Sequence, residues 1–247
     1  MFERRPLSQE TCVVAGDDPP SLPAELAARV AALWQAAQED CGGIMFDGRI
    51  LTLTEFAPGR LAGHYVPYSW FIAQKRDPKL IPILDIRPLA VSGILTVGDC
   101  LIFGLRGRDV VADRGSWELA PSGSVDIQAL RPDGTVDAAG LLLREAVEEL
   151  NIDPAWVCDI RPIALLENGT TRVNELCFAA HLEGSAERLR KAFAGRNNQE
   201  YEALRLVPIG DIADFVGDPD RPIDPGSLAL LAAVGHLHAA AFLAASA

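Results

Sequence analysis

Residues 144–152, Arg-Glu-Ala-Val-Glu-Glu-Leu-Asn-Ile, constrain this chain more than any other segment because they predict a helix with three carboxylates on one face. Glu145, Glu148 and Glu149 are related as i, i+3 and i+4, the spacing of neighbours on a helix surface. Three adjacent anions repel one another, and a divalent cation such as Mg²⁺ or Mn²⁺, which prefers hard oxygen ligands, relieves that repulsion. Arg144 can fix one of these carboxylates through a two-point ion pair. The plainer interpretation is a solvated acidic helix face, as most charge runs are.

A buried stripe accompanies the acidic face and supports the helix. Leu142, Ala146 and Leu150 follow one another at intervals of four, which predicts a side that packs on a core. Asn151 stands where the helix needs a left-handed terminating residue, a position that favours glycine and then asparagine.

These residues resemble the end of the Nudix box, Gly-x5-Glu-x7-Arg-Glu-U-x-Glu-Glu-x-Gly-U, where U is aliphatic. The arginine and the three metal-binding glutamates match, and so do both aliphatic positions, Ala146 and Ile152. Asn151 replaces the usual glycine, which the left-handed position tolerates.

The front half of the box departs from the pattern. Counting back places the family's glutamate on Val136 and its glycine on Leu130, and the nearest candidates are Asp137 and Gly134. The Pro-Asp-Gly turn at residues 132–134 indicates a short insertion that displaces this half of the box.

The resemblance extends to both sides of the box. Residues 117–123, Trp-Glu-Leu-Ala-Pro-Ser-Gly, are similar to the family's Trp-x-Leu-Pro-Gly-Gly strand and turn. Residues 200–208 resemble its late acidic loop and strand, which implies that Glu200 or Glu202 binds a further metal or acts as a base. The catalytic set that the resemblance implies is therefore Arg144, Glu145, Glu148, Glu149 and Glu202, and the metal ligands are Glu145, Glu148, Glu149 and Glu200.

The N-terminal part narrows the resemblance. Residues 41–49, 65–70 and 88–93 are similar to the Nudix-type UDP-glucose pyrophosphatases of animals and plants. That group implies an α/β/α sandwich with a mixed sheet (residues 89–247), preceded by a small α+β module (residues 1–88) that helps to bind the nucleotide, and followed by a C-terminal helix. It implies Mg²⁺-dependent cleavage of a UDP-sugar to UMP and sugar 1-phosphate. ADP-ribose, NADH or coenzyme A as substrate, or nucleotide sensing without hydrolysis, are the alternatives.

Candidate substrate-binding residues lie on segments expected to border the cleft. Arginines offset diphosphate charge, and the candidates are Arg106, Arg108, Arg114 and Arg172, although an arginine taken singly is more often a surface residue. Tyr68, with Tyr65 and Phe71, can stack a base or simply belong to the core.

Composition limits the partners. With 22 basic and 34 acidic residues among 247, the net charge of −12 argues against a nucleic-acid polymer but not against a small metal-bound nucleotide. The five cysteines are scattered without a CxxC pair, which favours reduced core residues in a cytoplasmic protein, and the N-terminus lacks the apolar region of a signal peptide. Residues 227–247 carry no charge, but their many alanines and two histidines favour a helix capped by Ser227 that packs on the body or on a second subunit, not a membrane span.

Local signals predict the remaining elements. The first twenty residues read as loop, and a helix opens at Ser21 and Pro23 and closes at Gly42-Gly43. Asp47-Gly48 predicts a hairpin between residues 44–46 and 49–56. Residues 90–97 and 100–105 predict a strand pair joined at Gly98-Asp99, followed by a strand at 116–119.

Overall fold

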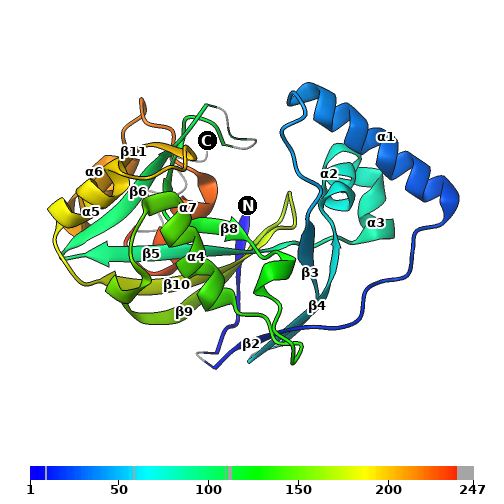
Figure 1. Cartoon of the computed structure of the whole chain (residues 1–247), viewed down its shortest axis with the longest axis horizontal. Coiled ribbons are helices and arrows are strands. Elements are labelled where there is room, and N and C mark those ends of the chain that lie inside the picture. The colour runs from blue at the N-terminus through cyan, green and yellow to red at the C-terminus, as the bar shows by residue number, and fades with distance from the viewer. Residues whose placement is uncertain (9, 58, 109, 111–112, 238–247) are drawn as a thin grey trace.

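The computed structural model describes residues 1–8, 10–57, 59–108, 110 and 113–237. Among these residues the larger sheet has the order β1-β9-β10-β5-β6-β11, with β7 paired to β6 and β8 paired to β5 (Figure 1). Its strands are β1 (Phe2–Arg5), β5 (Leu89–Val97), β6 (Cys100–Arg106), β7 (Trp117–Leu119), β8 (Ser122–Ser124), β9 (Val157–Asn168), β10 (Asn174–Leu182) and β11 (Tyr201–Pro208). The sheet is mixed, because β10 and β5 are parallel and the other pairs are antiparallel.

Helices cover both faces of this sheet. On one face lie α4 (Ala138–Leu150) and α5 (Ala186–Ala194), and on the other lie α6 (Ile212–Val216) and α7 (Pro225–Ala233). Side chains alternate along a strand, so in β6 Ile102 packs into the core beneath α4, whereas Leu101 and Phe103 pack with α6 and α7. The predicted α/β/α sandwich with a mixed sheet is confirmed.

A smaller unit precedes β5 in sequence. It contains α1 (Ala24–Asp40), α2 (Tyr68–Arg76), α3 (Ile81–Leu84) and a sheet of order β2-β4-β3, with β2 (Cys12–Ala15), β3 (Arg49–Ala57) and β4 (Arg60–Pro67). Its sheet is docked on the sandwich, since Leu51 N donates to Val125 O (2.8 Å) and Ile50 forms an antiparallel β-bridge with Asp126. β1, by contrast, belongs to the large sheet, where it pairs with β9. The boundary at about residue 88 stays a prediction.

Two predictions for the first fifty residues are wrong. The segment expected to be loop contains the four-residue strands β1 and β2, whose partners β9 and β4 lie far along the chain. The hairpin at Asp47-Gly48 is absent from the described residues, because both residues cap α2 instead: Asp47 Oδ1 accepts from Ser69 N (2.7 Å) and Gly48 O from Tyr68 N (2.8 Å). The hairpin in this region is formed by β3 and β4.

The predicted acidic helix is α4, and its ends are well defined. Leu142, Ala146 and Leu150 are at most 1% exposed, as the stripe predicted. Asp137 caps the start by accepting from Gly140 N (3.0 Å). Asn151 ends the helix in the left-handed conformation, with φ 56°, and its Nδ2 donates to Ala192 O of α5 (2.8 Å), a contact that glycine cannot make.

The C-terminal helix is shorter than predicted. Asp224, not Ser227, caps α7 by accepting from Ser227 N (2.7 Å), while Ser227 Oγ accepts from Leu119 N (2.9 Å) and ties the helix to β7. The helix ends at Ala233 because Gly235 has φ +84° and His236 N bonds Leu231 O (2.9 Å), a Schellman termination. The rest of the predicted helix, residues 238–247, lies outside the described residues.

Two further sequence predictions concern composition. No helix in the described ranges is long and apolar enough to cross a membrane. The five cysteines are free, and the expectation that they lie in the core is wrong for the exposed Cys12, whereas Cys41 and Cys100 are partly buried against the core. Only Cys177 is buried, while Cys12 is exposed and the others are intermediate.

Candidate active site

The floor of the candidate site is formed where α4 passes beneath β8. Ser122 N donates to Glu149 Oε2 (3.3 Å), so the acidic face of the helix is anchored to the strand. Gly123 is needed at this crossing, because a Cβ there would lie 2.4 Å from Glu145 Oε1. Glu148, the third carboxylate, is exposed at the side of the pair.

Glu145, which is partly exposed, and the buried Glu149 lie together with little positive charge to neutralise them. Glu149 is 1% exposed, and its Oε1 accepts no hydrogen bond. Burial, with Glu200 and Glu145 close by, raises the pKa of Glu149 well above its ordinary value. Burial, followed by repulsion from Glu148 and Glu200, raises the pKa of Glu145 to about 7. A cation bound here would remove these penalties, although as they stand no three His, Cys, Asp or Glu side chains of the described residues are placed to hold a metal ion.

Arg144 pairs with Asp126 and not with the glutamates. Its Nη2 lies 3.1 Å from Asp126 Oδ1, in the segment that follows β8. Asp137, the nearest match to the front glutamate of the box, caps α4 and pairs with Arg131 (2.8 Å), away from the pair of glutamates. No local pattern marks Asp126, which lies 18 residues before Arg144.

The segment ahead of α4, where a short insertion was predicted, folds as a turn at residues 131–135. Gly134, with φ +83°, forms the turn, and its carbonyl accepts from Ala15 N of β2 (2.9 Å). Gly134 therefore has a structural position at the edge of the smaller sheet, and Pro132 and Asp133 lie at the tip of the turn.

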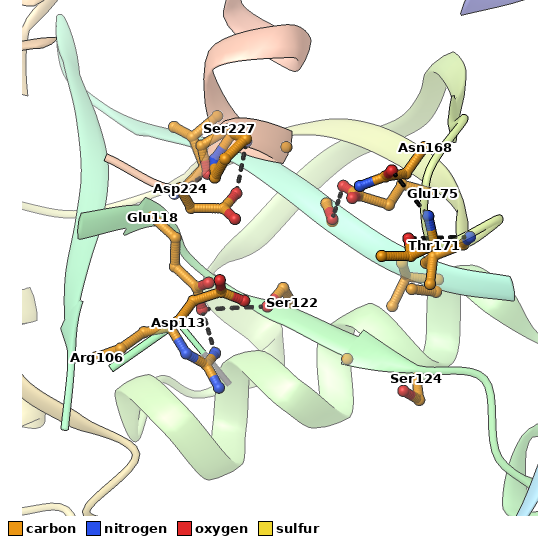
Figure 2. A pocket seen from close by; sticks show the side chains of 18 of the residues that line it. Arg106, Asp113, Glu118, Ser122, Ser124, Asn168, Thr171, Glu175, Asp224 and Ser227 are labelled. Atoms are coloured by element: carbon orange, nitrogen blue, oxygen red, sulfur yellow. Dashed lines mark hydrogen bonds and ion pairs between the residues drawn. The ribbon is translucent and has the colours of Figure 1, made fainter. Parts of the chain in front are cut away.

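A second acidic group stands above the floor and centres on Glu118 of β7. Glu118 is 7% exposed, and its Oε1 accepts from Arg106 Nη1 (2.7 Å) and Ser122 Oγ (3.3 Å) (Figure 2). The same oxygen accepts from Tyr201 Oη (2.7 Å). The same Arg106 nitrogen lies 3.3 Å from Glu200 Oε1. Burial raises the pKa of Glu118, although Arg106 acts in the opposite direction. The sequence analysis missed Glu118, because an acidic residue in a short strand carries no functional signal of its own.

A cleft of about 420 Å³ opens over these groups. Tyr68, Phe71 and Lys75 of α2 line one side of it, so the smaller unit contributes to the cavity. Glu175 of β10 and Asp224 line another wall (Figure 2).

The two acids of that wall were also missed by the sequence analysis. Burial, and then the charge of Asp224, raises the pKa of Glu175 to about 7. Burial raises the pKa of Asp224 to about 6. Ser92 Oγ donates to Glu175 Oε2 (2.9 Å).

The structure brings some of the predicted substrate and loop residues to the cleft and not others. Tyr68, Arg106 and Glu200 line it. Four predicted residues are placed elsewhere: Glu202, Arg108, Arg114 and Arg172. The predicted residues of α4 lie under β8 and are not among those that line the cleft: Arg144, Glu145, Glu148 and Glu149.

The geometry of β11 explains why the Glu202 side chain points away from the cleft, with Arg108 beside it. Tyr201 faces inward in β11, so the next side chain, Glu202, faces solvent, and its Oε1 accepts from the exposed Arg108 N (3.1 Å). Arg114 is exposed, and its Nε donates to Val110 O (2.5 Å). Arg172 lies in the β9–β10 turn with φ 64° and pairs with Asp85 (2.9 Å).

Solved structures that are similar to this chain include several Nudix proteins. No family model matches this chain, and no curated protein matches it. Among solved structures, the Nudix domain of Shewanella oneidensis NrtR, complexed with ADP-ribose, has a TM-score of 0.43 and 13% identity over 64% of this chain and 96% of its own. An ADP-ribose pyrophosphatase from Streptococcus suis has a TM-score of 0.38 and 19% identity, covering 65% of this chain and 92% of its own. A Nudix-family hydrolase from Clostridium perfringens has a TM-score of 0.40 and 12% identity, covering 65% and 97%. Because the identities and TM-scores are low, these similarities carry no function over to this chain.

Proposed function

We propose that this chain is a Nudix pyrophosphohydrolase that cleaves a nucleoside diphosphate linked to another moiety. The observation that carries the proposal is the pair Glu145 and Glu149, which lie beneath β8 with Glu149 Oε1 buried and unpartnered. A buried anion in that state costs free energy, so its retention points to a function. The sequence that contains the pair matches the metal-binding end of the Nudix box.

The chemistry of these donors fits Mg²⁺ or Mn²⁺. Four carboxylates would hold the ion, and all of them are hard oxygen ligands. They are Glu145, Glu148 and Glu149 of α4, and Glu200 in the loop before β11. Glu148 is exposed, so its side chain can rotate at little cost. When bound, the metal offsets phosphate charge and lowers the pKa of a coordinated water.

The protein's own residues then orient the substrate and move a proton. Arg106 faces the cleft, where its guanidinium offers hydrogen bonds to phosphate oxygens. Asp126 holds Arg144 against the start of the acidic run. Water attacks one phosphorus, the anhydride P–O bond breaks, and the second phosphate leaves with the bonding electrons. Glu200, which lines the cleft, is our candidate to accept the proton of the water, ahead of the exposed Glu202.

A UDP-sugar, cleaved to UMP and sugar 1-phosphate, is the substrate we favour. What supports a sugar is the wall formed by Glu175 and Asp224, since carboxylates accept hydrogen bonds from hydroxyl groups. Tyr68 and Phe71, in the module that we place at residues 1–88, supply an apolar surface for the base. ADP-ribose, NADH and coenzyme A are the competing substrates, and nucleotide sensing without hydrolysis is the competing function.

The test is a hydrolysis assay with the full chain, Mg²⁺ and a panel of UDP-, GDP- and ADP-sugars, ADP-ribose, NADH and coenzyme A, with the products identified by chromatography. UMP and sugar phosphate from UDP-sugars are the expected products, and Glu149→Gln is the inactive control. Turnover of a different substrate would preserve the class of reaction and remove the UDP-sugar. A folded protein that binds nucleotide without turnover in Mg²⁺ or Mn²⁺ would instead be a sensor.

A further inference from the structure

Tyr201, the first residue of β11, is fully buried directly after the candidate base Glu200. Its hydroxyl donates to Glu118 Oε1 (2.7 Å), and its carbonyl accepts from Arg196 Nη2. The ring lies against Gly104 of β6, where a Cβ would be 2.5 Å from ring atom Cδ1. Gly104 therefore leaves the space that this ring fills.

Glu200 is held by two groups of the same network. Gly107 N donates to the Glu200 carbonyl (2.7 Å), which fixes the backbone. Arg106 Nη1 lies 3.3 Å from Glu200 Oε1 and 2.7 Å from Glu118 Oε1, so Glu118 also determines where Arg106 stands. The position of Glu200 consequently depends on Glu118, to which Tyr201 is bonded.

The network continues to the floor of the site. Ser122 Oγ donates to Glu118 Oε1 (3.3 Å), and Ser122 N donates to Glu149 Oε2 (3.3 Å). Hydrogen bonds thus run from Tyr201 through Glu118 and Ser122 to the buried glutamate of α4. A brace needed only for folding would not require a buried carboxylate at its centre, because an apolar pair fills such a space at lower cost.

We propose that Tyr201 is a positioning residue that, through Glu118 and Arg106, holds Glu200 over the carboxylates of α4, an inference that rests on the proposed function. The hydroxyl of Tyr201 bonds Glu118, with Glu149 of α4 close by. It acts by keeping Glu118 Oε1 in place, which in turn keeps Arg106 beside Glu200.

The experiment compares Tyr201→Phe with Thr96→Val as a matched control. Each change removes one hydroxyl and preserves the size of the side chain, but Thr96 lies at the far end of β5, where its Oγ1 bonds His181 (3.0 Å). Amide hydrogen exchange of Gly107 and residues 199–202 is measured first, on the metal-free protein. We expect exchange there to be about 10-fold faster in Tyr201→Phe and unchanged in Thr96→Val.

Function is read in two ways, as hydrolysis and as Mn²⁺ binding measured by calorimetry. Tyr201→Phe should lower kcat about 10-fold with KM within about 2-fold, and Glu200→Gln about 10²-fold. Because Tyr201 acts through Glu200, the double variant should be no worse than Glu200→Gln alone. Both single variants should weaken Mn²⁺ binding. Gly104→Ala, which displaces the ring, should reproduce the effects of Tyr201→Phe.

Several results would overturn the proposal. If amide exchange is unchanged in Tyr201→Phe, the hydroxyl does not hold the segment around Glu200 in place, whatever the activity of the protein. Faster exchange with unchanged kcat and Mn²⁺ affinity would show that Tyr201 has a structural role only. If the losses in kcat of the two single variants multiply in the double variant, Tyr201 acts independently of Glu200. If no substrate is hydrolysed, the proposed function fails, and exchange with Mn²⁺ affinity still decides the role of Tyr201.

Discussion

Replacing Gly123 with alanine should damage the site without altering any ionisable group. The new Cβ would lie 2.4 Å from Oε1, 2.5 Å from Cδ and 2.7 Å from Cγ of Glu145, whereas contacts below 3.0 Å essentially do not occur. The carboxylate must therefore retreat by at least about 0.6 Å. Since a displacement of about 1 Å can cost 10²-fold in rate, we expect kcat to fall by about 10- to 10²-fold. The fold should survive, because the obstructing atoms belong to a side chain that can rotate.

Gly210→Ala is the matched control for this prediction. No atom lies within 4 Å of a Cβ at residue 210, so this substitution should leave both activity and stability unchanged. The assay is Mg²⁺-dependent hydrolysis, with thermal unfolding followed by circular dichroism. Gly123→Ala protein that is folded and retains kcat within about 2-fold of the original would refute the argument that Glu145 must stand where it does.

Three further changes test the charges and the packing. Glu149→Gln should lower kcat by at least about 10²-fold while leaving the metal-free protein at least as stable, because the amide cannot carry the charge that burial penalises; a large loss in Tm would contradict this. With a folded pKa of about 7, Glu175 holds its proton in the folded state after the unfolded chain has released it, so stability falls as pH rises from about 4.5 to above 7. The free energy of unfolding should fall by about 1–3 kcal/mol over this range, after allowance for water in the cleft. Glu175→Gln should reduce the difference between the unfolding free energies measured by urea titration at pH 5 and at pH 8. An unchanged difference would exclude Glu175 as the cause. Gly63→Ala would place a Cβ 2.0 Å from the carbonyl oxygen of Thr52, so the unfolding free energy should drop by more than about 2 kcal/mol, and a drop below about 0.5 kcal/mol would show that β3 and β4 can separate freely.

The parts that could be predicted are those in which neighbouring residues determine the outcome. The stripe of Leu142, Ala146 and Leu150 defined α4, and Asn151 defined its end. Gly98 marked the turn between β5 and β6, because a tight turn requires a residue that accepts positive φ. In each case the signal and the structure that it specifies lie within a few residues of each other.

The parts that could not be predicted depend on partners far along the chain. Asp47-Gly48 has the composition of a hairpin turn, yet both residues cap α2, and no local pattern distinguishes these uses. Asp126 and Glu118 became recognisable only when folding set them beside Arg144 and Arg106. Glu202 was predicted as catalytic, but Glu200 precedes β11 and lines the cleft, whereas Glu202 is exposed at an irregularity of the strand between Tyr201 and Ala203.

The position of β1 has a consequence for how the protein is made. Arg5 of β1 pairs with Glu167 of β9, 162 residues later, so β1 leaves the ribosome long before the strand that pairs with its edge. β3 and β4 can pair long before that, because they are adjacent in sequence. The smaller unit is also enclosed between β1 and β5, both of them strands of the large sheet, so a shortened gene that begins near residue 88 would remove a strand of the sandwich together with that unit. Excising the smaller unit cleanly requires an internal deletion that keeps β1 and rejoins it ahead of β5.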